Sequence, residues 1–167
     1  ANVKHILRSL CEENLSVQNE LRAIIYALRP SVLDDLGLMP ALRSYVEHCV
    51  VAKGLEVYFN IEGETRRLPS EIETALFRIT QEALNNIVRH AVAHKVQVHA
   101  KFGGEGVDLT IIDDGCGFDA SELQAKADGR AIGLMGMHER AELLDGQLEI
   151  ASKPGQGCRI SVYIPTI

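Results

Sequence analysis

Five short segments of this chain of 167 residues alternate between apolar and polar side chains with a period of two. Successive side chains of a strand point to opposite faces, so each segment is expected to form a strand with one buried face. An apolar stripe with helical spacing follows the first segment and runs from residue 70 to residue 91. The five segments are 55–61, 95–102, 107–111, 148–150 and 160–164.

The alternation also limits how the strands can be arranged. Strands covered on one face are typical of antiparallel or mixed sheets, whereas parallel sheets are usually buried on both faces. Glycine-rich turns at 103–106 and 153–157 predict two hairpins, and a shorter helix is expected over 137–144. The sequence therefore predicts an α+β fold, a two-layer sandwich of a mixed, mostly antiparallel sheet with helices on one face, preceded by a long N-terminal helix.

The first 29 residues carry a heptad stripe, whose apolar positions alternate in spacings of four and three with one polar exception, Asn14. Pro30 is expected to end this helix. A lone helix with such a stripe must bury it, and we favour a helical bundle or a homodimer over packing against its own domain. Pro30, Gly37 and Pro40 then indicate a hinge-like connector, followed by a helix over 40–53.

Composition narrows the class of protein. Hydrophobic residues make up 46% and charged residues 24%, which are ordinary values for a globular domain. The net charge of −6 argues against direct binding of nucleic acid, and no apolar run approaches the roughly 18 residues of a membrane span. The cysteines form no C-x-x-C pair, which favours a reducing, cytoplasmic compartment. Because the chain begins with Ala1 rather than Met, we expect it to be a fragment. We expect no membrane contact by this fragment, and we expect the full-length protein to be anchored in the cell membrane.

Polar residues gather on one side of the helix expected over 70–91. Glu82, Asn86, Arg89 and His90 lie at i, i+4, i+7 and i+8, which places them in one stripe beside the apolar face. A carboxylate, an amide and a cation in one stripe could hold magnesium and phosphate, because Mg²⁺ prefers oxygen ligands. Taken alone, such a stripe is more often a solvated helix edge.

The third alternating segment ends in an acid followed by a glycine pair. Asp113 has the same parity as the apolar residues of its strand, so its side chain is expected on the core side. A buried carboxylate is costly unless it accepts hydrogen bonds. The donor could be an exocyclic amine such as that of adenine, with Gly115 and Gly117 admitting the ligand close to the backbone. A tight turn in which Asp113 binds backbone amides explains the local sequence equally well.

A third glycine cluster, 129–137, precedes the helix expected over 137–144. Glycines before a helix N-terminus expose backbone N–H groups that suit an anion. The segment 119–132 is polar and poorly periodic. We interpret it as a mobile lid over a ligand, or else as an ordinary surface loop.

Three other patterns are weaker. The spacing from Gly115 to Ala120 fits a loose dinucleotide fingerprint, but that motif belongs to parallel sheets buried on both faces. His90 and His94 are suitably spaced for a metal, yet the sequence offers no third ligand. The sequence has no G-x-x-x-x-G-K-[ST] loop, which excludes ordinary P-loop ATPases.

In their order along the chain, these clusters resemble the Bergerat-type (GHKL) ATP-binding domain of the sensor histidine kinases of two-component systems. Residues 82–90 resemble that family's N box, 113–117 its G1 box and 133–136 its G2 box. The connector over 28–38, Leu-Arg-Pro-x-x-Leu-Asp-Asp-Leu-Gly-Leu, resembles the subfamily that pairs with helix-turn-helix response regulators, as nitrate sensors do. The resemblance covers nearly the whole chain. It implies that residues 1–33 are the end of a dimerisation and phosphotransfer hairpin with its connector, and that 34–167 are an ATP-binding catalytic domain.

The resemblance implies roles for the matched residues. Asn86 would ligate the Mg²⁺ that bridges the ATP phosphates, and Glu82 would be the catalytic acid that helps to polarise the reaction centre. Arg89 and His90 would lie near the phosphates, and Asp113 would accept a hydrogen bond from the adenine amino group. The residues that would shape the pocket and lid are Gly115, Gly117, Gly133 and Gly136. Phosphoryl transfer mostly needs positioning and charge neutralisation, which these groups supply.

Two positions depart from the family's pattern. Cys158 stands where Thr is usual, near the expected adenine site. The subfamily's phosphoacceptor histidine is followed by an acid and lies on the first helix of the hairpin. The single helix before the connector matches the second helix, and its His5 is followed by Ile6. We therefore expect no phosphoacceptor in this chain.

The sequence thus predicts the ATP-binding catalytic region of a protein-histidine kinase that uses ATP and Mg²⁺. It would phosphorylate a histidine outside this chain, for relay to a response-regulator aspartate. The expected partners are a response regulator with a helix-turn-helix output domain and a second copy, joined through the N-terminal helix. The alternatives are an anti-sigma-factor-like regulator that phosphorylates serine, which the heptad helix and the connector disfavour, and a non-enzymatic dimerisation module.

Overall fold

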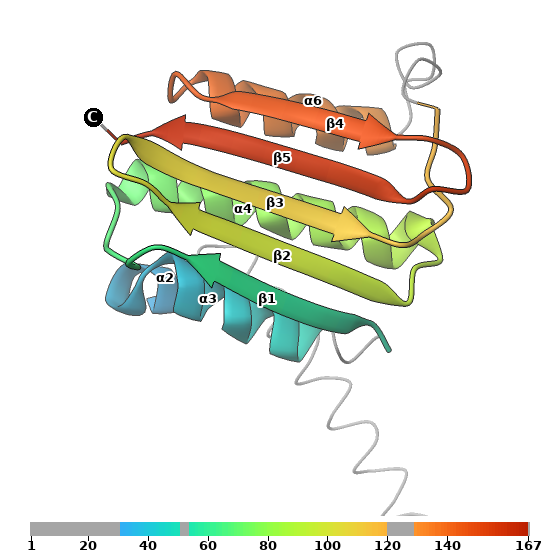
Figure 1. Cartoon of the computed structure of the whole chain (residues 1–167), viewed down its shortest axis with the longest axis horizontal. Helices are drawn as coiled ribbons and strands as arrows, with labels where there is room; N and C mark the ends of the chain where they lie inside the picture. The colour runs from blue at the N-terminus through green and yellow to red at the C-terminus, as the bar shows by residue number, and fades with distance from the viewer. Residues whose placement is uncertain (1–30, 51–53, 120–128, 167) are drawn as a thin grey trace, which may run out of the picture.

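One five-stranded sheet carries all the helices that the structure describes on a single face (Figure 1). The computed structural model describes residues 31–50, 54–119 and 129–166. The strands are β1 (Glu56–Glu62), β2 (Lys95–Phe102), β3 (Gly106–Asp113), β4 (Gln147–Ser152) and β5 (Cys158–Pro165). The helices are α2 (Ser31–Leu36), α3 (Leu38–Tyr45), α4 (Ser70–Asn86) and α6 (Gly129–Glu142), and two π-helical turns, η1 (Val46–Val50) and η3 (Ile87–Ala91), continue α3 and α4.

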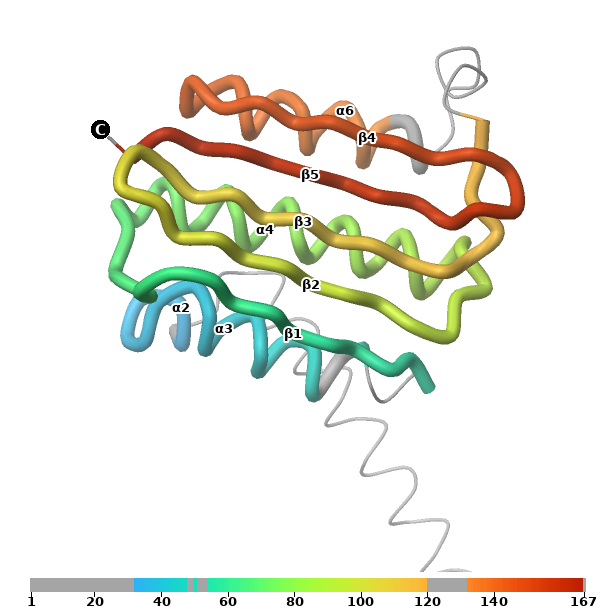
Figure 2. The backbone as a smooth tube through the Cα atoms, in the orientation of Figure 1, coloured from blue at the N-terminus to red at the C-terminus, as the bar shows by residue number. Residues whose placement is uncertain are grey.

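The strand order across the sheet is β1-β2-β3-β5-β4. β1 and β2 are parallel, and the other neighbouring pairs are antiparallel. Figure 2 shows the helical layer behind the sheet, with α2 and α3 near β1, α4 behind the centre and α6 near β4. The predicted two-layer α+β sandwich with a mixed, mostly antiparallel sheet is confirmed, as are the hairpins at 103–106 and 153–157. Both neighbours of β3 are antiparallel, which agrees with the rejection of the dinucleotide fingerprint.

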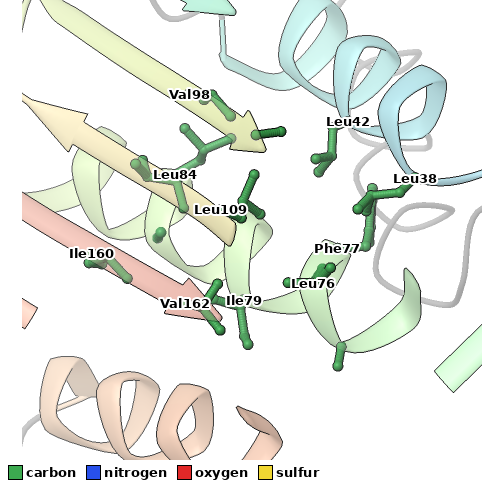
Figure 3. Close-up of a cluster of buried hydrophobic side chains, with 14 of the residues drawn as sticks. Leu38, Leu42, Leu76, Phe77, Ile79, Leu84, Val98, Leu109, Ile160 and Val162 are labelled. Carbon is green, nitrogen blue, oxygen red and sulfur yellow. The ribbon is translucent and has the colours of Figure 1, made fainter. Parts of the chain in front are cut away.

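The core lies between the apolar face of the sheet and α4. Val98 of β2 has no exposed surface, whereas its neighbour Gln97 points to the other face and is partly exposed. Leu76 and Ile79 of the predicted apolar stripe on α4 are fully buried against the strands. Figure 3 shows side chains of the two layers meeting around Leu109. Full burial of one such side chain contributes about 1.5–3 kcal/mol, so this layer interface is the main source of stability.

Helix α6 begins earlier than its glycine content suggests. The expected helix is present, but it covers Gly129–Glu142 rather than 137–144. The expected glycine loop before it is wrong, because Gly133 and Gly136 lie inside the helix. The same finding removes 129–132 from the expected loop or lid. Each glycine costs a helix about 1 kcal/mol relative to alanine. Met137 and Ala141 are fully buried, however, and the helix packs on α4 and β4, so tertiary packing outweighs propensity.

The connector is more helical than the sequence suggests. Residues 31–36 form α2, and α3 begins at Leu38 rather than at Pro40. Gly37 makes the turn between them with a φ of 86°, and its N–H donates to the carbonyl of Leu33 at 3.1 Å. Leu33 and Leu42 are buried in the same core as α4. The domain boundary placed between residues 33 and 34 stays a prediction.

Several predictions fall on residues outside the described ranges. They are the heptad helix over 1–29 with His5, the end of the helix expected over 40–53, and residues 120–128 of the expected lid. Within the described residues, no helix is long and apolar enough to cross a membrane.

Candidate functional site

The end of the long helix and the end of β3 are held together by backbone hydrogen bonds. The helix formed by α4 and η3 stops at Val92, which adopts a left-handed conformation with a φ of 51°. The Oδ1 of Asp114 then accepts the N–H groups of His94 and Lys95, both at 2.9 Å. The N–H of Cys116 donates to the last helical carbonyl, that of Ala91, at 2.7 Å. These bonds bring the two predicted polar clusters to one place.

A cavity lies between this helix end and the sheet. Its volume is about 30 Å³, and the empty space around it, counted together with open solvent at its mouth, is about 400 Å³. Four predicted site residues line it, namely Asn86, His90, Asp113 and Gly117. The other walls are Ala83, Ile87, Ala91, Cys116, Phe118, Leu134, Cys158 and Ile160. A mostly apolar cleft with a few convergent polar groups is the usual form of a small-molecule site.

Asp113 lies on the core side of the sheet, as its strand parity predicts. Only 6% of its surface is exposed. Its Oδ1 accepts the N–H of Gly115 at 2.8 Å, so the tight turn considered from the sequence is present. Asp113 is also one of the residues that line the cavity. The two interpretations are therefore compatible, since one oxygen can secure the turn while the carboxylate borders the space that a ligand would occupy.

The glycines after Asp113 let backbone segments pack at the cavity. Gly117 has a φ of +59°, and a Cβ on it would overlap the carbonyl oxygen of Lys153 in the β4–β5 turn. A Cβ on Gly115 would overlap the carbonyl oxygen of Ala91 at the helix end. The glycine pair thus permits the close approaches that join helix, strand and hairpin into one wall.

Asn86 holds a buried side-chain nitrogen, Nδ2, that makes no hydrogen bond, the one such atom among the described residues. A buried donor left unpaired costs about 1–3 kcal/mol. The adjacent amide differs, because the Oδ1 of Asn85 accepts the hydroxyl of Tyr45 at 2.8 Å. A side-chain amide can rotate to exchange its oxygen and nitrogen, so Asn86 can offer the cavity an acceptor or a donor. A buried polar atom without a partner calls for an explanation, and a ligand in the adjoining cavity would provide one.

The donor set at the cavity also bears on magnesium. An amide oxygen suits Mg²⁺, which commonly combines one or two protein ligands with substrate phosphates and water. Within the described residues, no group of three or more His, Cys, Asp or Glu side chains could hold a metal. The residues therefore fit a magnesium ion held by Asn86 together with phosphate oxygens, and do not fit an ion held by the protein alone.

Glu82 lies one turn before Asn86, where α4 meets α6. Gly133 of α6 sits directly against this side chain, and a Cβ on it would overlap Oε1 of the carboxylate. The structure thus brings the predicted N box and the first glycine of the predicted G2 box into contact. Gly136 does not face Glu82. A Cβ on it would instead meet the guanidinium of Arg140. Arg89 is exposed and lies outside the cavity lining.

Comparisons with known proteins identify the family of this chain. Residues 71–167, more than half of the chain, match the model of the histidine kinase-, DNA gyrase B- and HSP90-like ATPases. The chain belongs to this ATPase family.

Two curated relatives of this ATPase chain carry the name signal transduction histidine-protein kinase/phosphatase DegS. The protein from Brevibacillus brevis is 42% identical over 161 residues, which are 95% of this chain and 39% of that protein. The protein from Bacillus subtilis (strain 168) is 42% identical over 140 residues, which are 82% of this chain and 36% of that protein. The chain thus spans less than two fifths of the length of these relatives. The predicted resemblance to the ATP-binding region of a sensor histidine kinase is confirmed.

Solved structures share the fold of this ATPase domain. The histidine kinase domain of the blue-light activated histidine kinase from Erythrobacter litoralis EL346 matches with a TM-score of 0.59 and 20% identity, over 75% of this chain and 59% of that one. A second structure of that kinase matches with a TM-score of 0.62 and 20% identity, over 77% of this chain and 42% of that one. At such identities the likeness speaks for the fold, and it supports the predicted fold class.

Sequence reasoning missed several residues that line or support this cavity. Cys116 and Phe118 line the cavity between and after the G1 glycines. Asp114 joins the strand ends, and its pKa lies below the ordinary value because the N–H groups of Lys95, above all, and of His94 bind the carboxylate. The role of Asp114 could have been predicted from the sequence, since an Asp at a strand end often accepts hydrogen bonds from nearby backbone amides.

Proposed function

We propose that this chain binds ATP with Mg²⁺ at the cavity and donates the γ-phosphoryl group to a histidine outside the chain. The phosphoryl group would then pass to an aspartate of a response regulator. The observation that carries the proposal is the meeting of Asn86, His90 and Asp113 at one cavity, where the buried amide nitrogen of Asn86 has no partner. Membership of the ATPase family and relatives named as histidine kinases support it.

The adenine base would enter the apolar part of the cavity. There Asp113 would accept a hydrogen bond from the exocyclic amine, while its Oδ1 keeps the bond from Gly115. The apolar walls favour a flat base because they exclude water from its faces. Cys158, in place of the threonine usual in the family, also lines this space. A thiol is a weaker hydrogen-bond partner than a hydroxyl, so we propose that polar contacts near the base depend more on Asp113 here.

The phosphates would lie toward the other polar residues of the helix. Asn86 would hold Mg²⁺ through its amide oxygen, and the ion would neutralise charge on the phosphate oxygens. His90 borders the cavity, while the exposed Arg89 would reach the phosphates only from its rim. Gly115 and Gly117 would shape the pocket, and Gly133 and Gly136, which lie in α6 outside the cavity lining, would shape the lid. Phosphoryl transfer depends mainly on positioning and electrostatic neutralisation, and these residues would supply both.

Glu82 would act at the acceptor. The imidazole nitrogen of the acceptor histidine attacks the γ-phosphorus, and the bond to the β–γ bridging oxygen breaks, releasing ADP. Glu82 would polarise the imidazole and stabilise the positive charge that develops on it. In this structure Gly133 of α6 lies directly beside the Glu82 carboxylate, and Glu82 is partly exposed, so an acceptor would approach it past the first turns of α6.

The proposed partners are a second copy of the chain and a response regulator. We propose that residues 1–33 pair with a second copy through the N-terminal helix, and that the response regulator carries a helix-turn-helix output domain. The chain would work in the cytoplasm, within a protein that is anchored in the cell membrane. These proposals rest on the connector sequence and the heptad pattern rather than on the fold.

The test uses ATP labelled at the γ-phosphate. The chain would be compared with a longer version of the same protein that includes the segment before Ala1. We expect acid-labile, base-stable label on a histidine of the added segment, and no label on the chain alone. A matched Glu82→Gln variant should bind Mg-ATP normally and transfer label slowly. Stoichiometric labelling of His5 or of a serine would contradict the proposal, as would absence of label on the longer protein.

A further inference from the structure

The end of α4 that lies away from the cavity carries a buried acid. Glu73 stands in the first turn of this 17-residue helix, whereas Asn86 is its last residue. At 1.5 Å per residue the helix is about 25 Å long. The side chain of Glu73 is only 2% exposed. Its Oε1 accepts the N–H of Leu68 at 3.1 Å and pairs with the Nε of Arg67 at 3.2 Å.

Arg67 reaches from this acid to the end of α2. Its Nη2 donates to the carbonyl oxygens of Asp34 at 3.0 Å and Leu33 at 3.5 Å, and its Nη1 donates to that of Asp35 at 3.3 Å. The last carbonyls of a helix lack partners within the helix, and a cation is favourable beside them. The rigid, planar guanidinium suits several acceptors at once. Arg67 therefore caps α2 and pairs with Glu73 at the same time.

Helix α2 depends on the Arg67–Glu73 pair for its stability. The helix has only six residues, and such a short helix is unstable without tertiary contacts. Leu33 anchors one side in the core. A Cβ on Gly37, after the helix, would lie 3.0 Å from Cδ of Arg67 and 3.2 Å from Oε1 of Glu73. The turn thus needs a residue without a side chain so that Arg67 and Glu73 can close against it.

We propose that Arg67 and Glu73 are positioning residues that fix α2, through which residues 1–30 join the ATP-binding fold, to the helix that carries Glu82 and Asn86. Because α4 is continuous between its two ends, fixing α2 sets the direction in which the chain enters relative to the cavity. Phosphoryl transfer needs reacting atoms within about 3–3.5 Å, so this direction affects turnover. That last consequence rests on the function proposed above, whereas the docking of α2 does not.

The test is hydrogen exchange of the whole chain, followed by mass spectrometry, in Arg67→Ala and Arg66→Ala. Arg66 is a matched control because its guanidinium binds the carbonyl of Gly103 at 2.6 Å and the hydroxyl of Thr166, and not α2. We expect residues 33–37 to exchange roughly tenfold faster in Arg67→Ala, because charge-assisted bonds are lost. Exchange in β2 and β3 and the Kd for Mg-ATP should stay unchanged. Arg66→Ala should leave residues 33–37 as protected as in the parent.

Two further measurements separate the charge of Arg67 from its shape and link the docking of α2 to turnover. Arg67→Lys keeps the charge but loses the planar fork, so its exchange at 33–37 should lie between those of the parent and Arg67→Ala. In the longer protein that contains the acceptor histidine, Arg67→Ala should lower kcat for histidine phosphorylation and leave KM for ATP unchanged. Unchanged exchange at 33–37 in Arg67→Ala would overturn the proposal, as would acceleration spread equally over β2 and β3. Failure of the parent chain to bind Mg-ATP would instead count against the proposed function.

Discussion

The two ends of α4 each hold a polar side chain against the core, and they treat it differently. At the first turn, Glu73 is buried with an arginine and a backbone N–H as partners. At the last residue, the Nδ2 of Asn86 is buried and makes no bond. Folding alone favours the first arrangement, because an unpaired buried polar atom costs free energy that a paired one does not. We therefore expect the Glu73 end to contribute to stability, and we propose that the Asn86 end serves a ligand.

The surroundings of the two ends follow the same division. Arg67 and Glu73 join two helices, and their bonds are complete in the chain itself. Asn86 borders a cavity with Asp113, beside glycines that let backbone segments pack closely. Substitutions at the first end should change stability and spare ligand binding, and substitutions at the second end should do the reverse.

The largest effect on stability is expected at the paired end. Glu73→Ala leaves the N–H of Leu68 buried without an acceptor and removes the partner of Arg67, so the free energy of unfolding should fall by about 3 kcal/mol. Urea denaturation measures this change. Glu73→Gln keeps an acceptor for Leu68 and should lose less. A loss of unfolding free energy in Glu73→Ala no larger than that of an average surface substitution would show that the buried Glu73 does not stabilise the fold.

Asn86→Ala should have little effect on stability and a large effect on ligand affinity. It removes a buried amide nitrogen that has no partner, so the free energy of unfolding should change by less than about 1 kcal/mol. The affinity for Mg-ATP should fall by roughly 10- to 100-fold, because bonds to charged groups are worth about 1.5–3 kcal/mol. Isothermal titration calorimetry gives the affinity. The adjacent Asn85→Ala, which loses the bond from Tyr45, is the matched control and should retain affinity. Equal affinities in Asn86→Ala and the parent would contradict the assignment.

A smaller effect is expected where α6 meets Glu82. Alanine in place of a helical glycine gains about 1 kcal/mol of helix propensity, but the Cβ at position 133 would overlap the Glu82 carboxylate. Gly133→Ala should therefore bring no gain in the parent chain and a gain of about 1 kcal/mol in a Glu82→Ala background. A double-mutant cycle of urea unfolding measures the coupling. Additive effects would show that the two residues do not touch in solution.

The smallest effect concerns Asp114, which joins the strand ends beside the cavity. Its folded pKa lies below the ordinary value of 3.8 because the N–H groups of Lys95 and His94 bind the carboxylate. The ionised form therefore stabilises the fold above that pH, and the contribution disappears as the pH falls through the folded pKa. Asp114→Asn should be less stable than the parent at neutral pH, and the difference should narrow in strong acid. Thermal unfolding across pH measures it, and a difference that grows in acid would reverse the assignment.

The sheet and the long helix could be predicted from the sequence because the apolar residues of each recur with a regular period. The alternation around Val98 and the stripe that contains Leu76 predict which faces are buried, and both faces are buried as predicted. Parity alone also placed Asp113 on the core side. These are properties of single segments, so they can be read from residues a few positions apart.

Features that depend on contacts between distant segments could not be derived in this way. The early start of α6 depends on burial of Met137 and Ala141, which overrides the low helix propensity of Gly133. The cap that Arg67 places on α2 joins residues far apart in sequence, and nothing in the local pattern of either segment indicates it. The presence of Cys116 and Phe118 in the cavity wall depends on how the turn after β3 folds back.

The most direct test of the central claim is thermal unfolding with and without Mg-ATP, in the parent and in Asp113→Asn. This substitution keeps an oxygen for the N–H of Gly115 and replaces the second carboxylate oxygen by an N–H donor, which would face the adenine amine. Ligand at about 100 times Kd adds about 2.7 kcal/mol, which for a chain of this size raises Tm by roughly 5–10 °C. We predict that rise in the parent, dependent on Mg²⁺, and its loss in Asp113→Asn. A well-folded parent without any rise at millimolar Mg-ATP, or an equal rise in both proteins, would contradict the account.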